Sequence, residues 1–276
     1  AQVPVLVLKG SALAYWAYVA PHLRECADID LLLPSGDAAR HCVKLLESMD
    51  YAPLCSASAG DMVDFEIACT GGTMALRQEI DIHWHLSNAP LFAFRFGWNE
   101  LWADTTPLPA LAANAYGLAA VPAMLHACMH RAQHWALGGQ DRLKWLYDLV
   151  VMGERFGTHD WHAVQEQAIE RGLAGVCVDG LCAAMARFGP LVPGDTLDAL
   201  TLAASNEPLR VERLRDWWYF QRMNWRAIPQ MRMRWRWLGQ RMFPNRAYLR
   251  QRHGEHGGLL GALWRRVLAG AGRLRR

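Results

Sequence analysis

The stretch VLVLKGSALAYWAYVAPHLRECADIDLLL, residues 5–33, decides the architecture expected for this chain. The apolar residues 3–8 predict a buried strand, and the helix formers that follow Lys9-Gly10-Ser11 predict a helix with Ser11 as its N-cap. A second apolar run, residues 27–33, predicts another strand that stops at Pro34. Ser35 then favours the start of a helix over residues 36–49.

Two carboxylates, Asp28 and Asp30, lie on the second of these strands. Because successive side chains of a strand point to opposite faces, both carboxylates are expected on one face, with Ile29 and Leu31 directed into the core. Two carboxylates held this close together require a cation.

A third carboxylate is expected on a later strand. Residues 62–68 and 74–86 predict a hairpin whose turn is the stretch 70–73, and the second strand contains QEIDIHWHL. Alternation places Asp81, His83 and His85 on one face of this strand. The alternatives for the third carboxylate are Asp64, Glu66 and Glu79.

After Pro90 the pattern predicts helices for the rest of the chain, and no internal repeat is visible. The fold class is therefore α+β: a small mixed β-sheet domain with flanking helices, followed by a mostly α-helical domain. The domain boundaries are predicted at residues 1–110 (catalytic), 111–224 (helical) and 225–276 (a basic Arg/Trp-rich C-terminal tail). The predicted helices cover residues 121–137, 140–156, 160–171, 174–188, 196–205 and 209–223.

Composition indicates a cytoplasmic, soluble protein. Of 276 residues, 52% are hydrophobic and 20% are charged, and the seven cysteines include no C-x-x-C pair that would indicate a disulfide framework or a zinc knuckle. No leader peptide and no membrane-length apolar run is visible. Since residue 1 already adjoins an apparent core strand, native residues are expected upstream of it.

The charge is distributed unevenly. Residues 221–276 contain fourteen Arg and one acid, a net charge of +13, which leaves −10 for the preceding residues because the whole chain carries +3. Interleaved Arg and Trp suit contacts with nucleic acid or with an anionic membrane surface. The alternative is a basic tail laid across the acidic body, which would also allow a homodimer.

The strand–turn–helix of the opening stretch suits phosphate binding. Gly10 and Ser11 lie where backbone N–H groups and the positive end of a helix dipole can hold a phosphate, and Lys9 or Arg24 can add charge. With Asp81, the aspartates of the second strand could chelate two Mg²⁺ ions about 3.5–4 Å apart, with Mn²⁺ as the alternative metal. The chemistry expected is in-line displacement at an α-phosphate with release of pyrophosphate.

These motifs resemble the polymerase-beta-like nucleotidyltransferase superfamily. More narrowly, LKGSALAYWAY, LRECADIDLLL, EIDIHWHL, LHACMHRAQHW, RLKWLYDL and MFPNRAYLRQRHG resemble an uncharacterised bacterial nucleotidyltransferase family. The resemblance implies that Gly10 and Ser11 bind nucleotide and that Asp28, Asp30 and Asp81 bind metal. The sixteen residues between Ser11 and Asp28 form a longer gap than in minimal members of the superfamily.

Several histidines and one further aspartate have two interpretations each. His83 and His85 are either metal ligands or proton acceptors that line the site, or hydrogen-bonded residues at a strand end. His126, His130 and His134 form one helical stripe, which either holds zinc or, as we favour, packs the helical domain against the sheet. Asp148 either contacts the nucleotide or, as we favour, pairs with Arg142 or Lys144.

The function expected is Mg²⁺-dependent transfer of an NMP from an NTP, with ATP as the default donor, to a hydroxyl or phosphate acceptor on a small molecule, peptide or protein. One alternative is a toxin-like nucleotidyltransferase that modifies tRNA or protein through the basic tail. The other is an inactive nucleotide-binding or scaffold module.

Overall fold

The opening stretch folds in the predicted order of strand, helix and strand. The structure is a computed structural model that describes residues 3–54, 65–73 and 76–242. Strand β1 (Leu6–Val7) leads directly into α1 (Lys9–Trp16), and after the short turn η1 (Pro21–Leu23) the chain enters β2 (Asp28–Leu32). The two strands pair antiparallel.

The start of α1 differs from the prediction. Leu8 is the N-cap residue, and Ser11 lies inside the first turn, so the predicted cap at Ser11 is wrong. The chain turns abruptly into the helix at Lys9, whose φ of 52° lies in the left-handed region. The Ser11 hydroxyl instead donates to the carbonyl oxygen of Asp28 at 3.1 Å, which ties the helix to the start of β2.

A seven-stranded mixed sheet has the order β3-β4-β5-β2-β1-β7-β6. β2 pairs parallel with β5 and β1 pairs parallel with β7, whereas the other neighbours are antiparallel. The remaining strands are β3 (Ala52–Pro53), β4 (Glu66–Thr73), β5 (Leu76–His83), β6 (Thr105–Pro107) and β7 (Tyr116–Leu118).

The predicted hairpin of β4 and β5 is present, but residues 70–73 are not its turn. Residues 70–73 belong to β4 and pair with β5, so the predicted turn there is wrong. Two adjacent glycines, Gly71 and Gly72, made this strand end look like a turn. The predicted strand residues 62–64, and positions 74–75, lie outside the described residues.

Strands β6 and β7 correct the expectation that only helices follow Pro90. Each is three residues long, too short for a period-2 pattern to be recognised. Pro107 is tolerated because β6 is an edge strand, where a missing N–H need not leave a ladder partner unsatisfied.

The helices otherwise lie near their predicted positions, with one exception. Residues 209–223 do not form one helix, since η2 (Val211–Arg213) is followed by a separate helix that begins at Trp217 with Asp216 as its side-chain cap. The helices are α2 (Gly36–Glu47), α3 (Pro90–Ala93), α4 (Trp98–Ala103), α5 (Ala120–Ala136), α6 (Leu143–Gly153), α7 (Thr158–Glu170), α8 (Ala174–Phe188), α9 (Gly194–Asn206), α10 (Trp217–Ala227) and α11 (Met231–Met242).

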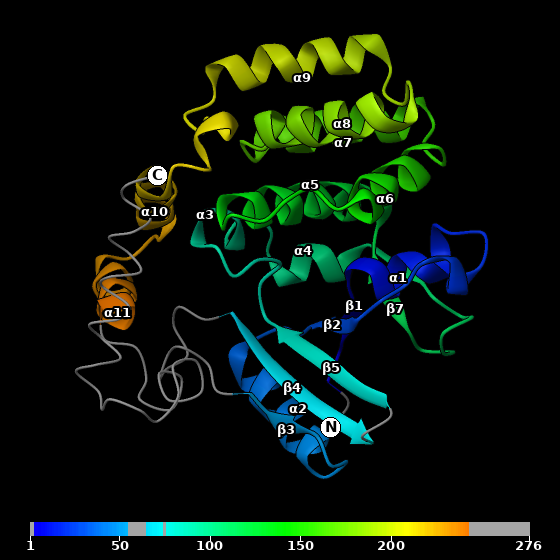
Figure 1. The fold of residues 1–276 in the computed structure, drawn as a ribbon, viewed down its shortest axis with the longest axis vertical. Coiled ribbons are helices and arrows are strands. Elements are labelled where there is room, and N and C mark those ends of the chain that lie inside the picture. Colours follow the sequence, from blue (N-terminus) through cyan, green and yellow to red (C-terminus); the bar gives the residue numbers. More distant parts are fainter. Residues whose placement is uncertain (1–2, 55–64, 74–75, 243–276) are drawn as a thin grey trace.

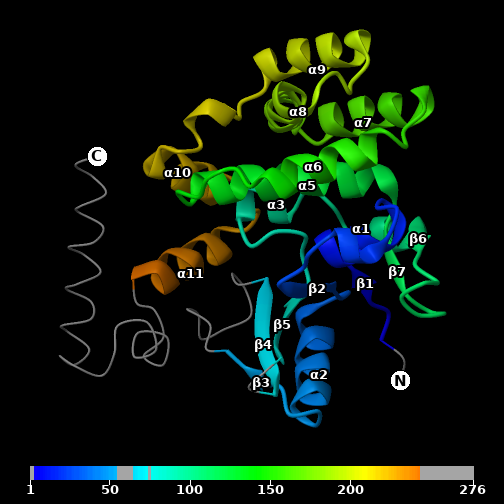
Figure 2. The same ribbon diagram turned by 45° about the vertical axis from the view of Figure 1, so that its right-hand side comes forward.

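The α+β architecture is as predicted. Figures 1 and 2 show helices α5 to α9 stacked in layers on one side of the sheet region, and α2 against the strands at the opposite end of the molecule. The larger hydrophobic cluster joins Leu6 and Leu32 of the sheet to residues of α5, α6 and α8, while a smaller one packs α2 against Ile80 and Ile82. The hydrophobic core therefore runs from the sheet into the helical layers without interruption.

None of the helices in the described parts of the chain combines the length and apolar character that crossing a bilayer requires.

Candidate active site

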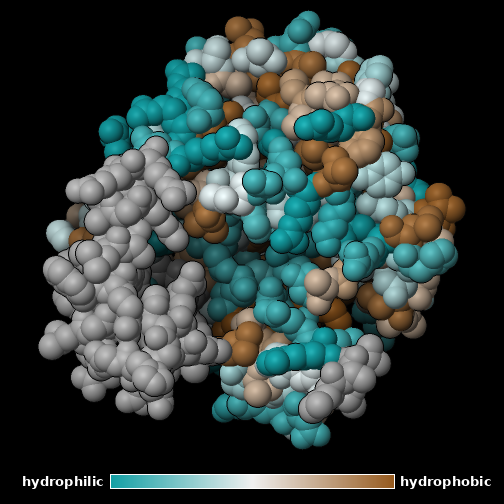
Figure 3. Space-filling model, viewed as in Figure 1, coloured by the Kyte–Doolittle hydropathy of each residue, from teal (hydrophilic) through white to brown (hydrophobic). Residues whose placement is uncertain are grey.

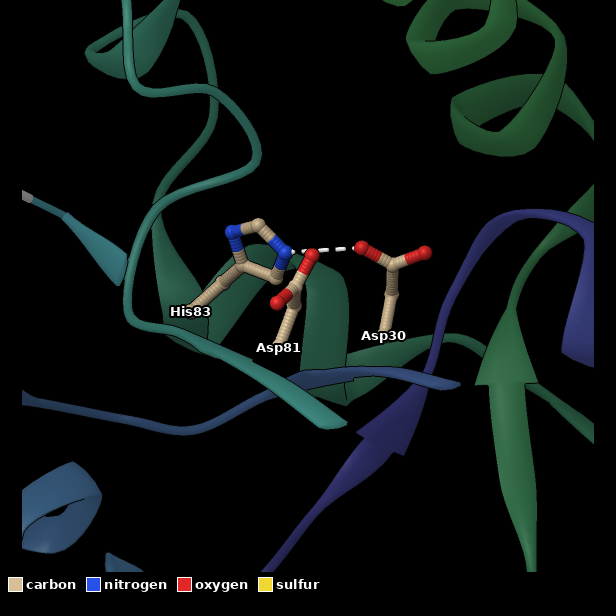
Figure 4. Close-up of side chains that lie close together, drawn as sticks. All are labelled: Asp30, Asp81 and His83. Atoms are coloured by element: carbon tan, nitrogen blue, oxygen red, sulfur yellow. Dashed lines mark hydrogen bonds and ion pairs between the residues drawn. The ribbon is translucent and has the colours of Figure 1, made fainter. Parts of the chain in front are cut away.

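Asp30 and Asp81 are direct neighbours across two parallel strands. In the ladder between β2 and β5, Asp30 pairs in register with Asp81, and Leu32 pairs with His83. Figure 4 shows the side chains of Asp30 and His83 directed toward each other, with Asp81 between them. Residues far apart in the sequence thus form one carboxylate–imidazole cluster, because parallel pairing aligns the two strands residue by residue.

Asp30 is almost fully buried and is held by two partners. Its Oδ1 accepts a hydrogen bond from Lys9 Nζ at 2.5 Å and lies 2.9 Å from His83 Nε2. Burial alone would raise the pKa of Asp30, but the His83 hydrogen bond and the Lys9 ammonium together hold it below its usual range. Asp30 is therefore a permanently ionised carboxylate at neutral pH.

Asp81 has the opposite electrostatic character. Burial, followed by the negative charges of Glu66 and Asp30, raises the pKa of Asp81 to about 8. Its Oδ1 is buried and has no hydrogen-bond partner. A buried acceptor without a donor is uncommon in folded proteins, and it indicates that a group outside the chain completes this position.

The cluster fits a divalent cation. Within the described ranges, Asp30, Asp81 and His83 are the one set of three His, Cys, Asp or Glu residues whose ligand atoms all lie within 4.8 Å of one another. Carboxylate oxygens suit Mg²⁺ and Mn²⁺, and an imidazole is better tolerated by Mn²⁺. The donor set contains two of the three carboxylates expected from the sequence, Asp30 and Asp81, with His83 in place of Asp28.

Asp28 stands apart from this cluster. It shares a face of β2 with Asp30 as expected, but it lies at the exposed start of the strand, in register with Glu79. Glu66, one alternative for the third carboxylate, approaches His83 Nδ1 at 3.5 Å and accepts a hydrogen bond from Asn88. Asp64 lies outside the described residues.

A cavity of about 260 Å³ opens beside Asp30. Its sheet side is formed by Lys9, Gly10, Asp28 and Asp30, and its other side by residues of α5 and α6. Figure 3 shows hydrophilic residues lining a recess between the helical layers and the sheet. Five of the seven residues expected to bind nucleotide or metal therefore border this cavity, whereas Ser11 and Asp81 are not among its lining residues.

Arg24 also borders the cavity, but most of its guanidinium is bound to protein. Nε and Nη2 donate to the two oxygens of Asp148 at 2.7 and 2.8 Å, and Nη1 donates to the carbonyl oxygen of Glu25. Asp148 also accepts from the Tyr18 hydroxyl at 2.7 Å. Asp148 thus forms an ion pair, as favoured, but with Arg24 and not with Arg142 or Lys144.

The Arg24–Asp148 ion pair leaves no room for a side chain at Gly10. A Cβ atom at position 10 would lie 2.8–2.9 Å from the Arg24 guanidinium, closer than real contacts allow. The glycine of the Gly-Ser turn is therefore needed for packing against Arg24 in addition to any contact with phosphate.

The histidine stripe of α5 faces the cavity. His126, His130 and His134 all line it, and they do not come together as a metal-binding set in the described structure. Burial, and then the positive charge of Lys9, lowers the pKa of His126 to about 3. Burial likewise lowers the pKa of His130 and His134, so the stripe consists of neutral imidazoles.

His85 does not join the site. β5 ends at His83, and the His85 Nδ1 lies 2.9 Å from the Ala93 carbonyl oxygen while its ring packs on Phe65 and Phe94. The expectation that His85 shares a face with Asp81 and His83 is wrong, because the strand geometry does not extend that far.

Sequence reasoning missed three features of the site. It did not foresee the Lys9–Asp30 ion pair, the anchoring of Asp148 by Tyr18, or the position of Trp145 in the cavity wall. The four-residue spacing of the histidines did predict one helical face, but not what that face meets.

Comparison with known protein families gives a match over most of the described sheet and helices. A family described as "Uncharacterised nucleotidyltransferase" matches residues 1–189, which include every strand of the described structure and all of the cavity's lining residues. No curated protein matches the chain significantly. Because the match covers more than half of the sequence, it identifies nucleotidyl transfer as the general chemistry of the group, and the chain belongs to this uncharacterised nucleotidyltransferase family.

Proposed function

We propose that this protein transfers an NMP from an NTP to a hydroxyl or phosphate acceptor and releases pyrophosphate. The observation that carries the proposal is the register pairing of Asp30 with Asp81 beside a cavity that begins at the N-terminus of α1. A carboxylate pair next to a helix N-terminus provides both requirements of the reaction, a place for cations and a place for phosphates.

The metal-binding role is assigned to Asp28, Asp30 and Asp81, with His83 as a further donor. A divalent cation held there would neutralise phosphate charge and lower the pKa of the attacking hydroxyl. We propose Mg²⁺ as the metal, with Mn²⁺ as the alternative that the His83 nitrogen would favour.

The protein's own groups prepare this site. Lys9 and His83 keep Asp30 ionised and fix its orientation through two contacts to the same oxygen. Lys9 also lines the cavity, so its ammonium can pair with a phosphate there. We propose that the backbone N–H groups at Gly10 and Ser11 donate hydrogen bonds to the phosphates, because the N-terminus of α1 has no side-chain cap.

The test is transfer of label from an α-labelled NTP to a panel of acceptors, followed by mass spectrometry for added NMP mass. Asp28→Asn is the most informative variant because Asp28 is exposed and its substitution should spare the fold. We expect loss of about 100-fold or more in transfer, since electrostatic transition-state contacts of this kind are worth that much.

Asp198→Asn, a substitution at an exposed position of α9, is the matched control and should retain full activity. Equal activity of both variants would contradict the assignment of Asp28. Absence of transfer by the unaltered protein to every acceptor, with each NTP, would contradict the proposed reaction.

A further inference from the structure

Two helix N-termini open on the same cavity. Lys9 and Gly10 of the first turn of α1 line it, and so do Lys144 and Trp145 of the first turn of α6. Neither helix has a side-chain cap at its N-terminus. The Trp145 N–H donates to the Arg142 carbonyl oxygen at 2.9 Å, whereas the Gly10 and Lys144 N–H groups precede the first intrahelical bonds and are available to an outside acceptor. Both helix dipoles favour an anion in this space.

The α6 end of the cavity carries excess positive charge. Arg142, the N-cap residue of α6, and Lys144 both line the cavity, and neither forms a salt bridge with any residue the structure describes. The Arg142 guanidinium lies 5.0 Å from the centre of the Trp145 ring, which holds it at the cavity wall. Asp148, the acid one turn along α6, is already neutralised by Arg24.

A buried imidazole in the wall has one unpaired nitrogen. His126 is 3% exposed, lines the cavity, and has no hydrogen-bond partner for its Nε2. Leaving a buried polar atom unpaired costs roughly 1–3 kcal/mol, so a ligand that bonds to it is strongly favoured. His130 and His134 continue this polar wall toward the Arg142 end, since all three histidines lie on one face of α5.

We infer that this helical wall, composed of the α6 N-terminus, Arg142, Lys144 and the α5 histidines, binds the polyphosphate chain of the donor nucleotide. The inference deepens the proposed function, on which it rests. A polyphosphate offers several anionic oxygens in a row. These match the two helix N-termini, the two cations that form no salt bridge within the described residues, and the row of imidazoles on α5. A nucleobase would leave the cations of this wall without a counter-charge.

The experiment measures binding by titration calorimetry to the full chain in EDTA, at constant ionic strength, with inorganic triphosphate, ATP, adenosine and a single-stranded RNA as separate probes. The double variant Arg142→Gln/Lys144→Gln removes two positive charges from the wall. Lys44→Gln/Arg187→Gln removes two charges from exposed positions on α2 and α8 and is the matched control. His126→Asn retains a hydrogen-bonding group in the buried position.

We expect inorganic triphosphate and ATP to bind, adenosine to bind far more weakly, and Arg142→Gln/Lys144→Gln to weaken triphosphate binding about tenfold or more, as for the loss of charge-assisted hydrogen bonds. The control pair should change binding less than about twofold, because neither Lys44 nor Arg187 lines the cavity and exposed charges are screened by salt. His126→Asn should weaken binding less than the double variant does.

Equal triphosphate affinity of the wall variant and the control pair would overturn the inference. So would a wall variant that loses RNA binding while triphosphate binding is unchanged, since the wall would then bind a nucleic-acid backbone. The binding measurement involves no metal and no turnover, so it is independent of the transfer assay. If the protein transfers no NMP but triphosphate binding still depends on the wall, the proposed reaction is refuted and the inference about the wall stands.

Discussion

The two central carboxylates of the cluster illustrate how neighbours of the same type acquire opposite properties. Asp30 receives contacts from Lys9 and His83 and stays ionised, whereas Asp81 receives no hydrogen bond at its buried oxygen and is disfavoured as an anion. A pair with separated pKa values can hold one negative charge at low cost and accept a second when a cation arrives. The difference between the two pKa values depends on which carboxylate forms the ion pair with Lys9.

Asp81 makes the metal-free protein less stable as the pH rises. Its pKa is raised to about 8 in the folded state, above the value of about 4 expected for the unfolded chain, so between these values the folded state binds the additional proton. Stability should therefore fall from pH 5 to pH 8, in contrast to the contribution of Asp30, which is lost only as the pH falls below about 4. Thermal unfolding in EDTA across this range measures the slope.

Asp81→Asn should remove this decline, because asparagine occupies the site without a charge at any pH, and it should also weaken Mn²⁺ binding measured by calorimetry. Asp198→Asn should leave both the slope and metal binding unchanged. An unaltered slope in Asp81→Asn would show that Asp81 is not the group responsible.

At the scale of elements, the loop before β2 is fastened to α6 by one buried ion pair. Arg24 and Asp148 are 124 positions apart in the chain, and both are almost fully buried. The Arg24 guanidinium also packs against the first turn of α1 at Gly10. The position of the phosphate-binding turn therefore depends on a helix that follows the sheet in sequence.

Gly10→Ala should destabilise the protein by about 1–3 kcal/mol, as for an overpacked core position, because the added methyl group displaces Arg24 from Asp148. Gly194→Ala is the matched control, since a Cβ atom at that position meets nothing within 4 Å. It should be neutral or stabilising by up to about 1 kcal/mol. Urea unfolding at pH 7 gives both values, and equal stability of the two variants would refute the packing role of Arg24.

At the scale of the whole molecule, one hydrophobic cluster joins the strands to the helical layers. It includes Leu6, Leu8 and Leu32 near the sheet, Met124 of α5 and Phe220 of α10. The predicted division into residues 1–110 and 111–224 stays a prediction, but β7 at Tyr116–Leu118 pairs with β1 and so continues the sheet past that boundary.

Because this core is shared, we expect one cooperative unfolding transition, with far-UV circular dichroism and tryptophan fluorescence giving superimposable curves. Met124→Ala should shift both curves together by about 2–5 kcal/mol, since Met124 is fully buried in the cluster. Leu202→Ala, at a position 69% exposed, should change stability by less than about 0.5 kcal/mol. Separate midpoints for the two probes would contradict a shared core.

The sequence by itself determined the order of the first elements, the shared face of Asp28 and Asp30, and the strand that carries Asp81. These follow from local rules, because strand alternation and helix periodicity depend only on nearby residues. The same rules were insufficient at Ser11, at the glycines of β4 and at the short strands β6 and β7, where pairing with distant residues decided the conformation.

Tertiary structure alone decided the electrostatics and the cavity. Parallel pairing aligned Asp30 with Asp81. The Lys9 backbone is left-handed and its ammonium contacts Asp30. Arg24 pairs with Asp148, 124 positions away in the chain. Burial and the identity of the nearest charge set a pKa, and both depend on contacts between residues that no local pattern connects. For this reason the residue types of the site were visible in the sequence, while the pairing of Lys9 with Asp30 and the position of the histidine stripe at the cavity were not.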